Sequence, residues 1–314
     1  MILFQRTKNG NMREVVFCGF KFTYMKKAKL PPHIDKNLVL PQISALNESG
    51  ITLEKRSPRL IVSLTSFPER TPEIHFTIYS LLTQDFKPDE VILWLAKEQY
   101  PNGVDDLPEI LQQLQQWGLT IKWCEDLRSY KKLLPSLLEY PEDIIVIVDD
   151  DVYYPKDWLK KLYDEHLKDP KTVIGHRLHY IRLGKDGKPL PYKQWKKNST
   201  RVIPSYRNFL TGCGGILYPP HSLFKDVADM ELIRKLAPYA DDIWFWAMSV
   251  LNGVKIKTFK GRYRKVLLVN PEREMRQTDE LTLTKVNIAN GGNDKQMAEV
   301  IAAYPEILEK LKED

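Results

Sequence analysis

Apolar runs and segments with a helical pattern alternate along residues 59–151. Helices are expected at 72–83, 107–117 and 130–139. Short apolar runs without polar alternation flank them, at 59–65, 90–96, 119–124 and 144–148. Runs of this kind are typical of strands that are covered on both faces. The repeated strand–helix order predicts an α/β fold with a mostly parallel central sheet flanked by helices.

The same pattern separates an N-terminal extension from a larger domain. Residues 31–58 are punctuated by Pro, Asn, Ser and Gly, which is typical of a connector. We therefore expect an extension with its linker at 1–58 and one domain at 59–314. Within the domain, regular strand–helix alternation covers 59–151, and the pattern changes over 152–314. In this second part we expect helices at 158–167, 241–252, 295–304 and 305–314, with one or two strands at 172–182.

The N-terminal extension combines alternating apolar residues with positive charge. Alternation at 15–24 predicts a strand, and Asn9-Gly10 before it is typical of a β-hairpin turn. Residues 1–30 carry seven Lys or Arg and one acid, Glu14, so their net charge equals the +6 of the whole chain. Two interpretations stay open: a basic, aromatic surface that contacts an anionic membrane, or an ordinary packed hairpin with solvated lysines. No recognition motif accompanies the charge, so nucleic acid is not an expected partner.

Three consecutive aspartates, Asp149, Asp150 and Asp151, end the fourth apolar run. They stand at the carboxyl end of a predicted buried strand, where open α/β sheets bind ligands. Three adjacent carboxylates repel one another, but carboxylate oxygens are the ligands that Mg²⁺ and Mn²⁺ prefer. The motif therefore indicates a divalent metal site, and the alternative is an acidic cap on the following helix.

Other polar residues follow the first and third predicted strands. Because the carboxyl ends of parallel strands meet at one edge of a sheet, we expect these residues in the same crevice as the aspartates. Cations would neutralise a pyrophosphate there, and a carboxylate would accept the imide N–H of uracil. Each residue by itself also fits a helix cap or a solvated loop. The candidates are Thr65, Ser66, Arg70, Asp126 and Lys132.

Two segments of the second half add candidates for donor binding. Thr211-Gly-Cys-Gly-Gly215 contains three glycines, which let a backbone approach a ligand closely or form a plain turn. Gly214 and Gly215 are the candidates from this segment. Arg177 is a candidate cation from 172–182, whereas the neighbouring His176 fits either the crevice or a packed core.

Two more polar pairs begin helices. Asp241 and Asp242 stand at the start of an apolar helix. They fit either helix caps or groups that take part in acid/base chemistry. A carboxylate among apolar neighbours has its pKa raised toward the working range of a general base. Asn293 and Asp294 follow two glycines at the start of a later helix. They are candidate metal ligands near a phosphate-binding helix N-terminus, and a plain helix cap is the alternative.

Several classes of protein are excluded or disfavoured. No apolar run approaches the roughly 18 residues that a membrane span needs. Cys18, Cys124 and Cys213 form no CxxC pair, so neither a disulfide framework nor a zinc site is expected, and a reducing cytoplasm fits. A GxGxxG motif after the first strand and a GxxxxGK[ST] motif are both absent, which disfavours a dinucleotide-binding fold and a P-loop enzyme.

Taken together, four motifs carry a resemblance to a known family. They are Ser63-Leu-Thr-Ser, Val148-Asp-Asp-Asp151, the Gly-Cys-Gly-Gly segment and Ala240-Asp-Asp-Ile-Trp. With them the chain resembles GT-A (Rossmann-like) glycosyltransferases, and more narrowly the bacterial capsule and lipopolysaccharide glycosyltransferases related to family 2. The resemblance covers roughly residues 59–305 and implies a nucleotide-binding half at 59–151 and an acceptor-binding half at 152–314.

The resemblance also implies roles for the acidic motifs. In such enzymes a DxD motif binds a divalent metal on the pyrophosphate, which assigns Asp149 and Asp151 to Mn²⁺ or Mg²⁺. It assigns Asp150 to the ribose of the nucleotide sugar or to the metal. An acidic pair supplies the base in inverting members, which assigns Asp242 to the acceptor proton and Asp241 to acceptor binding. Here Asp-Asp replaces the commoner Glu-Asp, so the choice of base between the two stays open.

The implied activity is metal-dependent, inverting transfer of a sugar from a nucleotide sugar, expected to be a UDP-sugar. The implied acceptor is a hydroxyl of a growing bacterial surface glycan (capsule or lipopolysaccharide), free or lipid-linked, in the cytoplasm or at the cytoplasmic face of the inner membrane. Three alternatives remain: a retaining glycosyltransferase on the same scaffold, a nucleotidyltransferase or two-metal phosphohydrolase that uses Asp149 to Asp151, and a glycan-binding module without catalytic activity.

Overall fold

The computed structural model describes residues 4–9, 12–17, 20–25, 30–276, 287 and 291–314. The chain divides into two compact units, Met1–Pro31 and Pro32–Asp314. Residues 32–58, which their composition groups with the N-terminal extension, fold with the larger unit. Helix α1 (Lys36–Ser44) places Val39 and Ile43 in one of its hydrophobic clusters.

The smaller unit is an antiparallel three-stranded sheet, β1-β2-β3. Its strands are β1 (Phe4–Asn9), β2 (Met12–Phe17) and β3 (Phe20–Met25). The single strand expected at 15–24 is therefore two strands, because Phe17 pairs with Phe20 across only two intervening residues. Gly10 of the expected Asn9-Gly10 turn lies outside the described residues, and Asn9 pairs with Met12.

The larger unit contains a seven-stranded sheet in the order β13-β9-β12-β7-β4-β5-β6. Neighbouring strands are parallel except for β12, which is antiparallel to both β7 and β9. This mostly parallel sheet confirms the predicted α/β fold. The strands are β4 (Leu60–Thr65), β5 (Glu90–Ala96), β6 (Leu119–Cys124), β7 (Ile144–Ile147), β9 (Val173–Gly175), β12 (Ile216–Tyr218) and β13 (Ile256–Lys257).

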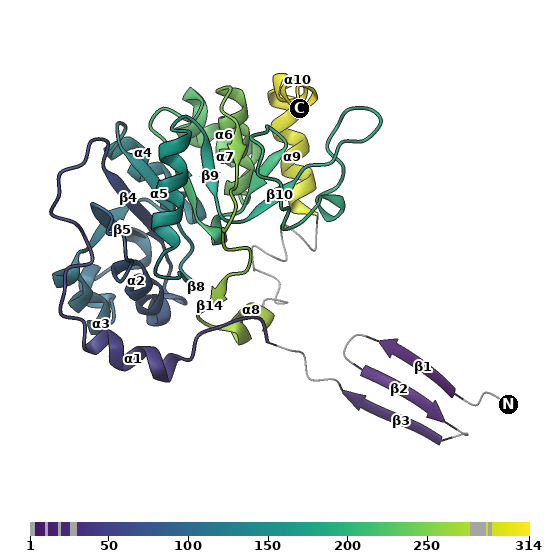
Figure 1. Ribbon diagram of the computed structural model, residues 1–314, viewed down its shortest axis with the longest axis horizontal. Coiled ribbons are helices and arrows are strands. Elements are labelled where there is room, and N and C mark those ends of the chain that lie inside the picture. The colour runs from purple at the N-terminus through teal and green to yellow at the C-terminus, as the bar shows by residue number, and fades with distance from the viewer. Residues whose placement is uncertain (1–3, 10–11, 18–19, 26–29, 277–286, 288–290) are drawn as a thin grey trace. The chain divides into compact units, whose positions relative to one another are not determined.

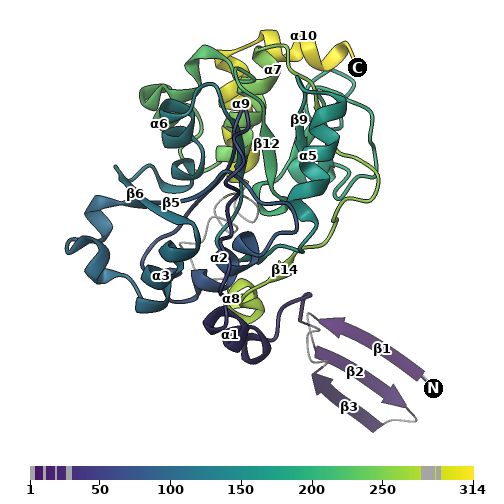
Figure 2. The same cartoon turned by 60° about the vertical axis from the view of Figure 1, so that its left-hand side comes forward.

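Helices cover both faces of this sheet, because its strands are apolar on both faces. Along β4, Leu60, Val62 and Leu64 join one hydrophobic cluster and Ile61 joins the other. Figure 2 shows α7, α9 and α10 grouped together on one side. The helices on that face are α4 (Leu134–Glu139), α6 (Met230–Leu236), α7 (Asp241–Leu251), α9 (Gly292–Ala303) and α10 (Glu306–Lys312). On the other face, besides α1, are α2 (Ile74–Leu82), α3 (Glu109–Gln113) and α5 (Trp158–Lys168).

Shorter elements complete the larger unit (Figure 1). They are β8 (Val152–Tyr153) paired with β14 (Leu267–Leu268), β10 (Leu178–Tyr180) paired with β11 (Asn208–Leu210), and α8 (Pro271–Arg276). No helix in the described part of the chain is both long and apolar enough to cross a bilayer.

The strand order creates a natural site for a ligand. The four parallel strands at one end of the sheet lie in the spatial order β6-β5-β4-β7. The chain runs outward from β4 to β5 and β6 and then returns to the other side of β4 as β7, so the direction of the strand order reverses at β4. Open α/β sheets bind ligands outside the carboxyl ends of the strands at such a switch point. The loops after β4 and β7 carry Ser66 and Asp149, which places the predicted residues of both loops side by side there.

Candidate active site

The three aspartates after β7 are linked to the loop after β4. Asp150 accepts hydrogen bonds from Ser66 Oγ at 2.6 Å and from Arg70 Nη1 at 2.9 Å. The same Arg70 nitrogen lies 2.6 Å from Asp151 Oδ2. Thr77 Oγ1 donates to the backbone carbonyl of Asp150 at 2.9 Å. One guanidinium group therefore pairs with two of the three carboxylates and joins the loops at the switch point.

Lys132 connects the third carboxylate to the second half of the domain. Its Nζ lies 2.8 Å from Asp149 Oδ1 and 2.9 Å from Asp241 Oδ2. The Lys132 side chain is buried, being only 7% exposed. Although burial opposes the charge, the surrounding aspartates raise the pKa of Lys132 well above its ordinary value. The ammonium group therefore stays charged and joins the aspartates after β7 to the start of α7.

Gly212 marks the point where these groups converge. Its N–H donates to Asp242 Oδ1 at 3.1 Å. A Cβ atom at this position would lie 2.6 Å from Lys132 Nζ, 3.1 Å from Asp149 Oδ1 and 3.3 Å from Asp242 Oδ1. An added methyl group would require the Lys132 ammonium group to shift, and the aspartates expected to bind donor and acceptor meet around this single backbone position.

Burial changes the acidity of the carboxylates in this cluster. Burial raises the pKa of Asp149, and it raises the pKa of Asp150 to about 6. It raises the pKa of Asp242 to about 7, with a further contribution from the negative charge of Asp241. Such shifts are common where several acids share a site with few cations. Asp242 consequently exchanges a proton near neutral pH, as a general base requires.

The donor atoms suit a divalent cation that is partly coordinated by its substrate. Among the described residues, no group of three or more His, Cys, Asp or Glu side chains is arranged to hold a metal unaided. Asp149 and Asp151 are two carboxylates beside the cations Lys132 and Arg70. Mg²⁺ sites often use one or two carboxylates and complete their coordination with substrate phosphates and water. The residues present therefore fit a metal that arrives with a phosphorylated ligand.

Other predicted residues make contacts that position loops. Thr65 Oγ1 donates to the carbonyl of Trp94 at 2.8 Å. Asp126 accepts hydrogen bonds from Lys131 Nζ at 3.0 Å and from Gln99 Nε2 at 3.0 Å. Thr65 is the last residue of β4 and Asp126 follows β6, so both lie at the expected edge of the sheet, and their contact with a ligand stays a prediction.

The glycines and the arginine of the second half pack against each other. Arg177 donates to Thr211 Oγ1 at 2.9 Å. A Cβ on Gly214 would lie 2.6 Å from Arg177 Cβ, and one on Gly215, which has a φ of 84°, would lie 2.1 Å from Trp158. The sequence motif therefore drew attention to this segment, but the glycine that faces the aspartates is Gly212. Only the conformation of the segment distinguishes the three.

Asn293 and Asp294 lie in the first turn of α9. Asp294 Oδ1 accepts a hydrogen bond from the backbone N–H of Tyr192 at 2.6 Å. No hydrogen bond or ion pair described for the chain joins either residue to Asp149 or Asp151. The contact with Tyr192 favours a structural role for Asp294, and metal ligation by this pair stays a prediction.

His176 belongs to the packed core. It is fully buried, its Nε2 donates to the carbonyl of Trp158 at 3.1 Å, and its Nδ1 accepts from the N–H of Tyr263 at 2.9 Å. Since Nδ1 is an acceptor, the imidazole is neutral. Burial lowers the pKa of His176 to about 3, in agreement with this tautomer.

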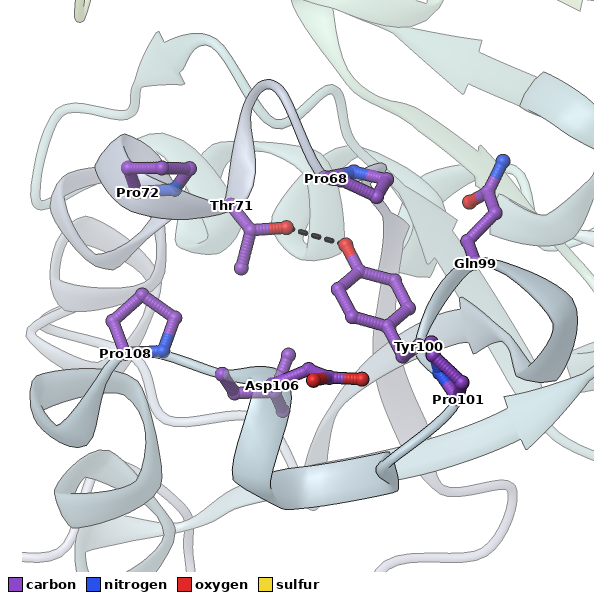
Figure 3. Close-up of a pocket in the computed structure, with 9 residues that line it drawn as sticks. Pro68, Thr71, Pro72, Gln99, Tyr100, Pro101, Asp106 and Pro108 are labelled. Atoms are coloured by element: carbon purple, nitrogen blue, oxygen red, sulfur yellow. Dashed lines mark hydrogen bonds between the residues drawn. The ribbon is translucent and has the colours of Figure 1, made fainter.

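A cavity of about 540 Å³ opens beside the loop that carries Arg70 (Figure 3). Thr71 and Tyr100 are hydrogen-bonded to each other in its wall. Gln99, which donates to Asp126, lies at its rim. The cavity is lined by Pro68, Thr71, Pro72, Gln99, Tyr100, Pro101, Asp106, Leu107 and Pro108.

Solved structures that are similar to the chain include three proteins of low sequence identity. S. aureus TarS 1–349 in complex with UDP-GlcNAc is 13% identical, with a TM-score of 0.49 over 81% of this chain and 71% of that one. The mannosyltransferase PcManGT from Pyrobaculum calidifontis, in complex with GDP-Man and Mn²⁺, is 14% identical, with a TM-score of 0.43 over 85% and 81%. CMP:2-keto-3-deoxy-manno-octonic acid synthetase, complexed with CTP, is 14% identical, with a TM-score of 0.41 over 71% and 96%.

The family assignment rests on the sequence itself. No curated protein matches the chain. The model of the family described as "Glycosyl transferase family 2" matches residues 64–222, which is half of the chain and includes Asp149, Lys132 and Gly212. The chain therefore belongs to glycosyl transferase family 2, and it is a glycosyltransferase with a GT-A fold.

Proposed function

We propose that this glycosyltransferase transfers a sugar, with inversion and with the help of Mn²⁺ or Mg²⁺, from a nucleotide sugar to a hydroxyl group of a glycan. The observation that supports this most is the convergence on Gly212. Asp149 of the expected donor site and Asp242 of the expected acceptor site both lie within contact distance of that one backbone position. A donor and an acceptor bound at the two sites would meet there.

On the donor side, Asp149 and Asp151 would hold the metal through their carboxylates. A bound divalent cation would supply positive charge that offsets the negative charge of the leaving nucleoside diphosphate. Arg70 and Lys132 add protein cations next to the same aspartates. Asp150 is already held by Ser66 and Arg70, so we propose that it orients the loop and contacts the nucleotide sugar.

The cavity beside this loop offers a place for the nucleoside. Its lining includes Pro68, two residues before Arg70, and Gln99, whose side chain donates a hydrogen bond to Asp126. We propose that the base enters this cavity and that Asp126 accepts its imide N–H, as the carboxylate of a uracil site would. Thr65, Arg177, Gly214 and Gly215 would shape the donor site through the loop contacts described above. We take UDP-sugars as the first donor class to test.

On the acceptor side, Asp242 would act as the general base. Its pKa of about 7 allows it to accept the proton of the attacking hydroxyl near neutral pH. The hydroxyl oxygen forms a bond to the anomeric carbon as the bond from that carbon to the phosphate oxygen breaks. Asp241, paired with Lys132, would bind and orient the acceptor. By resemblance to capsule and lipopolysaccharide enzymes, we propose a bacterial surface glycan, free or lipid-linked, as the acceptor.

A product assay tests the proposal. The purified protein is incubated with UDP-glucose, UDP-GlcNAc or GDP-mannose, with MnCl₂ or with EDTA, and the phosphorylated product is identified. Release of a nucleoside diphosphate that requires metal supports the proposal. Release of pyrophosphate or inorganic phosphate would instead favour the nucleotidyltransferase or phosphohydrolase. Once an acceptor is found, the anomeric configuration of the product distinguishes inversion from retention.

Variants separate the two proposed sites. Asp149→Asn is expected to lose metal-dependent nucleotide binding, and Asp242→Asn is expected to keep nucleotide binding but lose transfer. Asp164→Asn is a matched control, because Asp164 pairs with Lys160 on the exposed surface of α5. Full transfer by Asp242→Asn together with an inactive Asp241→Asn would assign the base to Asp241.

A further inference from the structure

The strand register of the smaller unit separates its residues onto two faces. In an antiparallel sheet, directly paired residues share a face and successive residues alternate. Three rows of paired residues therefore lie on one face: Phe4–Phe17–Phe20, Arg6–Val15–Phe22 and Lys8–Arg13–Tyr24. The rows on the other face are Gln5–Val16–Lys21, Thr7–Glu14–Thr23 and Asn9–Met12–Met25.

The first of these faces, which we name the aromatic–basic face, has an unusual composition. It gathers the five Phe and Tyr residues of 1–31, together with Arg6, Lys8 and Arg13. It contains no acid, since Glu14, the one acid of this segment, lies on the opposite face. Phe20, at the all-phenylalanine end, is 71% exposed.

The rows of the aromatic–basic face are graded from apolar to charged. Successive rows are two residues apart along the strand, so the phenylalanine row and the Lys8–Arg13 row are separated by roughly 14 Å. A sheet face that only packs on a protein core would not carry three cations. A face that is only solvated would not collect every aromatic residue of the segment. Aromatic residues next to Lys and Arg are typical of surfaces that enter the interface of an anionic bilayer.

We propose that the aromatic–basic face binds the surface of an anionic lipid bilayer. Phenylalanines at one end would enter the boundary between headgroups and acyl chains, while Arg6, Lys8 and Arg13 pair with lipid phosphates. The opposite face, where Glu14 and Lys21 offset each other's charge among polar and aliphatic residues and none of the paired residues is aromatic, would stay in water. This proposal does not depend on the catalytic one, because it concerns a separate compact unit.

The test is sedimentation of the full-length protein with vesicles. Vesicles contain phosphatidylcholine alone or with about one third phosphatidylglycerol, an anionic fraction that gives a surface potential like that of a cytoplasmic leaflet. Binding is expected to the anionic vesicles and to weaken as salt is raised. Equal binding to both kinds of vesicle, or to neither, would overturn the proposal.

Two charge-matched variants test the face itself. Arg6→Gln/Lys8→Gln/Arg13→Gln removes three cations from the aromatic–basic face, and it is expected to lower partitioning at least about tenfold, since each basic residue near an anionic surface contributes measurably. Lys160→Gln/Lys168→Gln/Lys312→Gln removes three exposed cations of the larger unit, and it is expected to change partitioning less than about twofold. Equal losses in the two variants would show general charge attraction and overturn the proposal.

Two further measurements complete the test. Phe20→Ser replaces an exposed aromatic residue, so the fold should tolerate it, and it is expected to lower partitioning without changing the salt dependence. Tighter binding to poly(U) than to anionic vesicles at equal salt would identify nucleic acid as the ligand instead. Nucleoside diphosphate release by each variant, measured without vesicles, should equal that of the wild type, so a failure of the catalytic proposal is recognised separately.

Discussion

At the scale of single residues, Lys132 is the side chain on which the site depends most. Its buried ammonium group lies between Asp149 and Asp241, 2.8 and 2.9 Å away. Removing one partner of a buried ion pair leaves uncompensated charge in a poorly hydrated place. The same position therefore supports both the stability of the domain and the geometry of the two acidic motifs.

Lys132→Met is expected to lower the free energy of unfolding by about 3–5 kcal/mol, the usual cost of breaking a buried pair. It is also expected to abolish transfer. Because Mn²⁺ would replace the missing positive charge, MnCl₂ should raise the Tm of the variant more than that of the wild type. Urea denaturation and thermal unfolding provide these measurements.

Lys160→Met is the matched control, since its pair with Asp164 is exposed on α5. Exposed pairs contribute about 1 kcal/mol or less. A Lys132→Met protein as stable as this control would contradict the buried bridge.

His176 predicts how stability depends on pH. The pKa of its imidazole is about 3 in the folded state, because of burial, against an ordinary value near 6.5. Below pH 6.5 the unfolded chain binds a proton that the folded state does not, so the stability contribution of a neutral His176 is lost as pH falls from 6.5 toward 3. The loss is about 1.4 kcal/mol for each pH unit.

His176→Gln removes this titration while an amide can still donate to Trp158 and accept from Tyr263. Between pH 7.5 and 5.5, the wild type is expected to lose about 1.4 kcal/mol more stability than the variant. Denaturant titrations of both proteins at the two pH values measure the difference. An identical loss in the two proteins would show that the folded state accepts the proton.

At the scale of elements, the segment Gly212–Gly214 shows why one glycine matters for function. Gly212→Ala adds a methyl group 2.6 Å from Lys132 Nζ, so the Asp149–Lys132–Asp241 bridge must shift. We expect transfer to fall at least tenfold, because displacing catalytic groups by about 1 Å costs on the order of 100-fold. Steady-state kinetics at saturating donor measure this effect.

Gly253→Ala serves as the control for a glycine substitution. Gly253 has a φ of 71° and nothing within 4 Å of the added Cβ. An alanine there would therefore destabilise the protein only through its unfavourable backbone conformation. The control is expected to lower the Tm while each folded molecule keeps its activity. Unchanged transfer by Gly212→Ala would mean that the cluster accommodates the methyl group.

The sequence predicted best those elements that are buried on both faces. The apolar runs at 59–65, 90–96 and 119–124 match β4, β5 and β6 within one residue. The helices were harder to bound, because the segment at 107–117 is α3 followed by a 3₁₀ turn, Leu114–Trp117, ending at Gly118. The one or two strands expected at 172–182 are β9 and β10, and β12 was not predicted; each of these strands has three residues, which are too few to show a period.

The sequence predicted which charged residues follow the ends of the strands. It did not predict which of several nearby groups each side chain would bind. The motif positions placed Ser66, Arg70 and Asp150 in one loop cluster, which the structure shows as direct contacts. The bridge made by Lys132 between two motifs more than 90 residues apart depends on how α7 packs, and no local pattern encodes it. Gly212 could not be distinguished from Gly214 and Gly215 in the sequence, because its proximity to the aspartates also depends on packing.

At the scale of the whole molecule, the two parts of the larger unit meet at their acidic motifs rather than at a preformed metal cage. Asp149 and Asp151 supply only part of a coordination shell, so a metal alone should bind weakly. A nucleotide alone should also bind weakly, because its phosphates would face the carboxylates of Asp149, Asp150 and Asp151. Metal and nucleotide should therefore bind together, each raising the affinity for the other.

Thermal unfolding measures this coupling directly. MnCl₂ alone and UDP in EDTA are each expected to change the Tm little, whereas MnCl₂ with UDP at 100 times its Kd should stabilise the protein by about 2.7 kcal/mol. For a protein of this size that corresponds to a shift of roughly 4 °C. Asp151→Asn, which removes one proposed ligand but leaves the Lys132 bridge intact, should lose most of the joint shift. An equal shift by UDP in EDTA would mean that Arg70 and Lys132 alone neutralise the pyrophosphate, and the metal would have no place in donor binding.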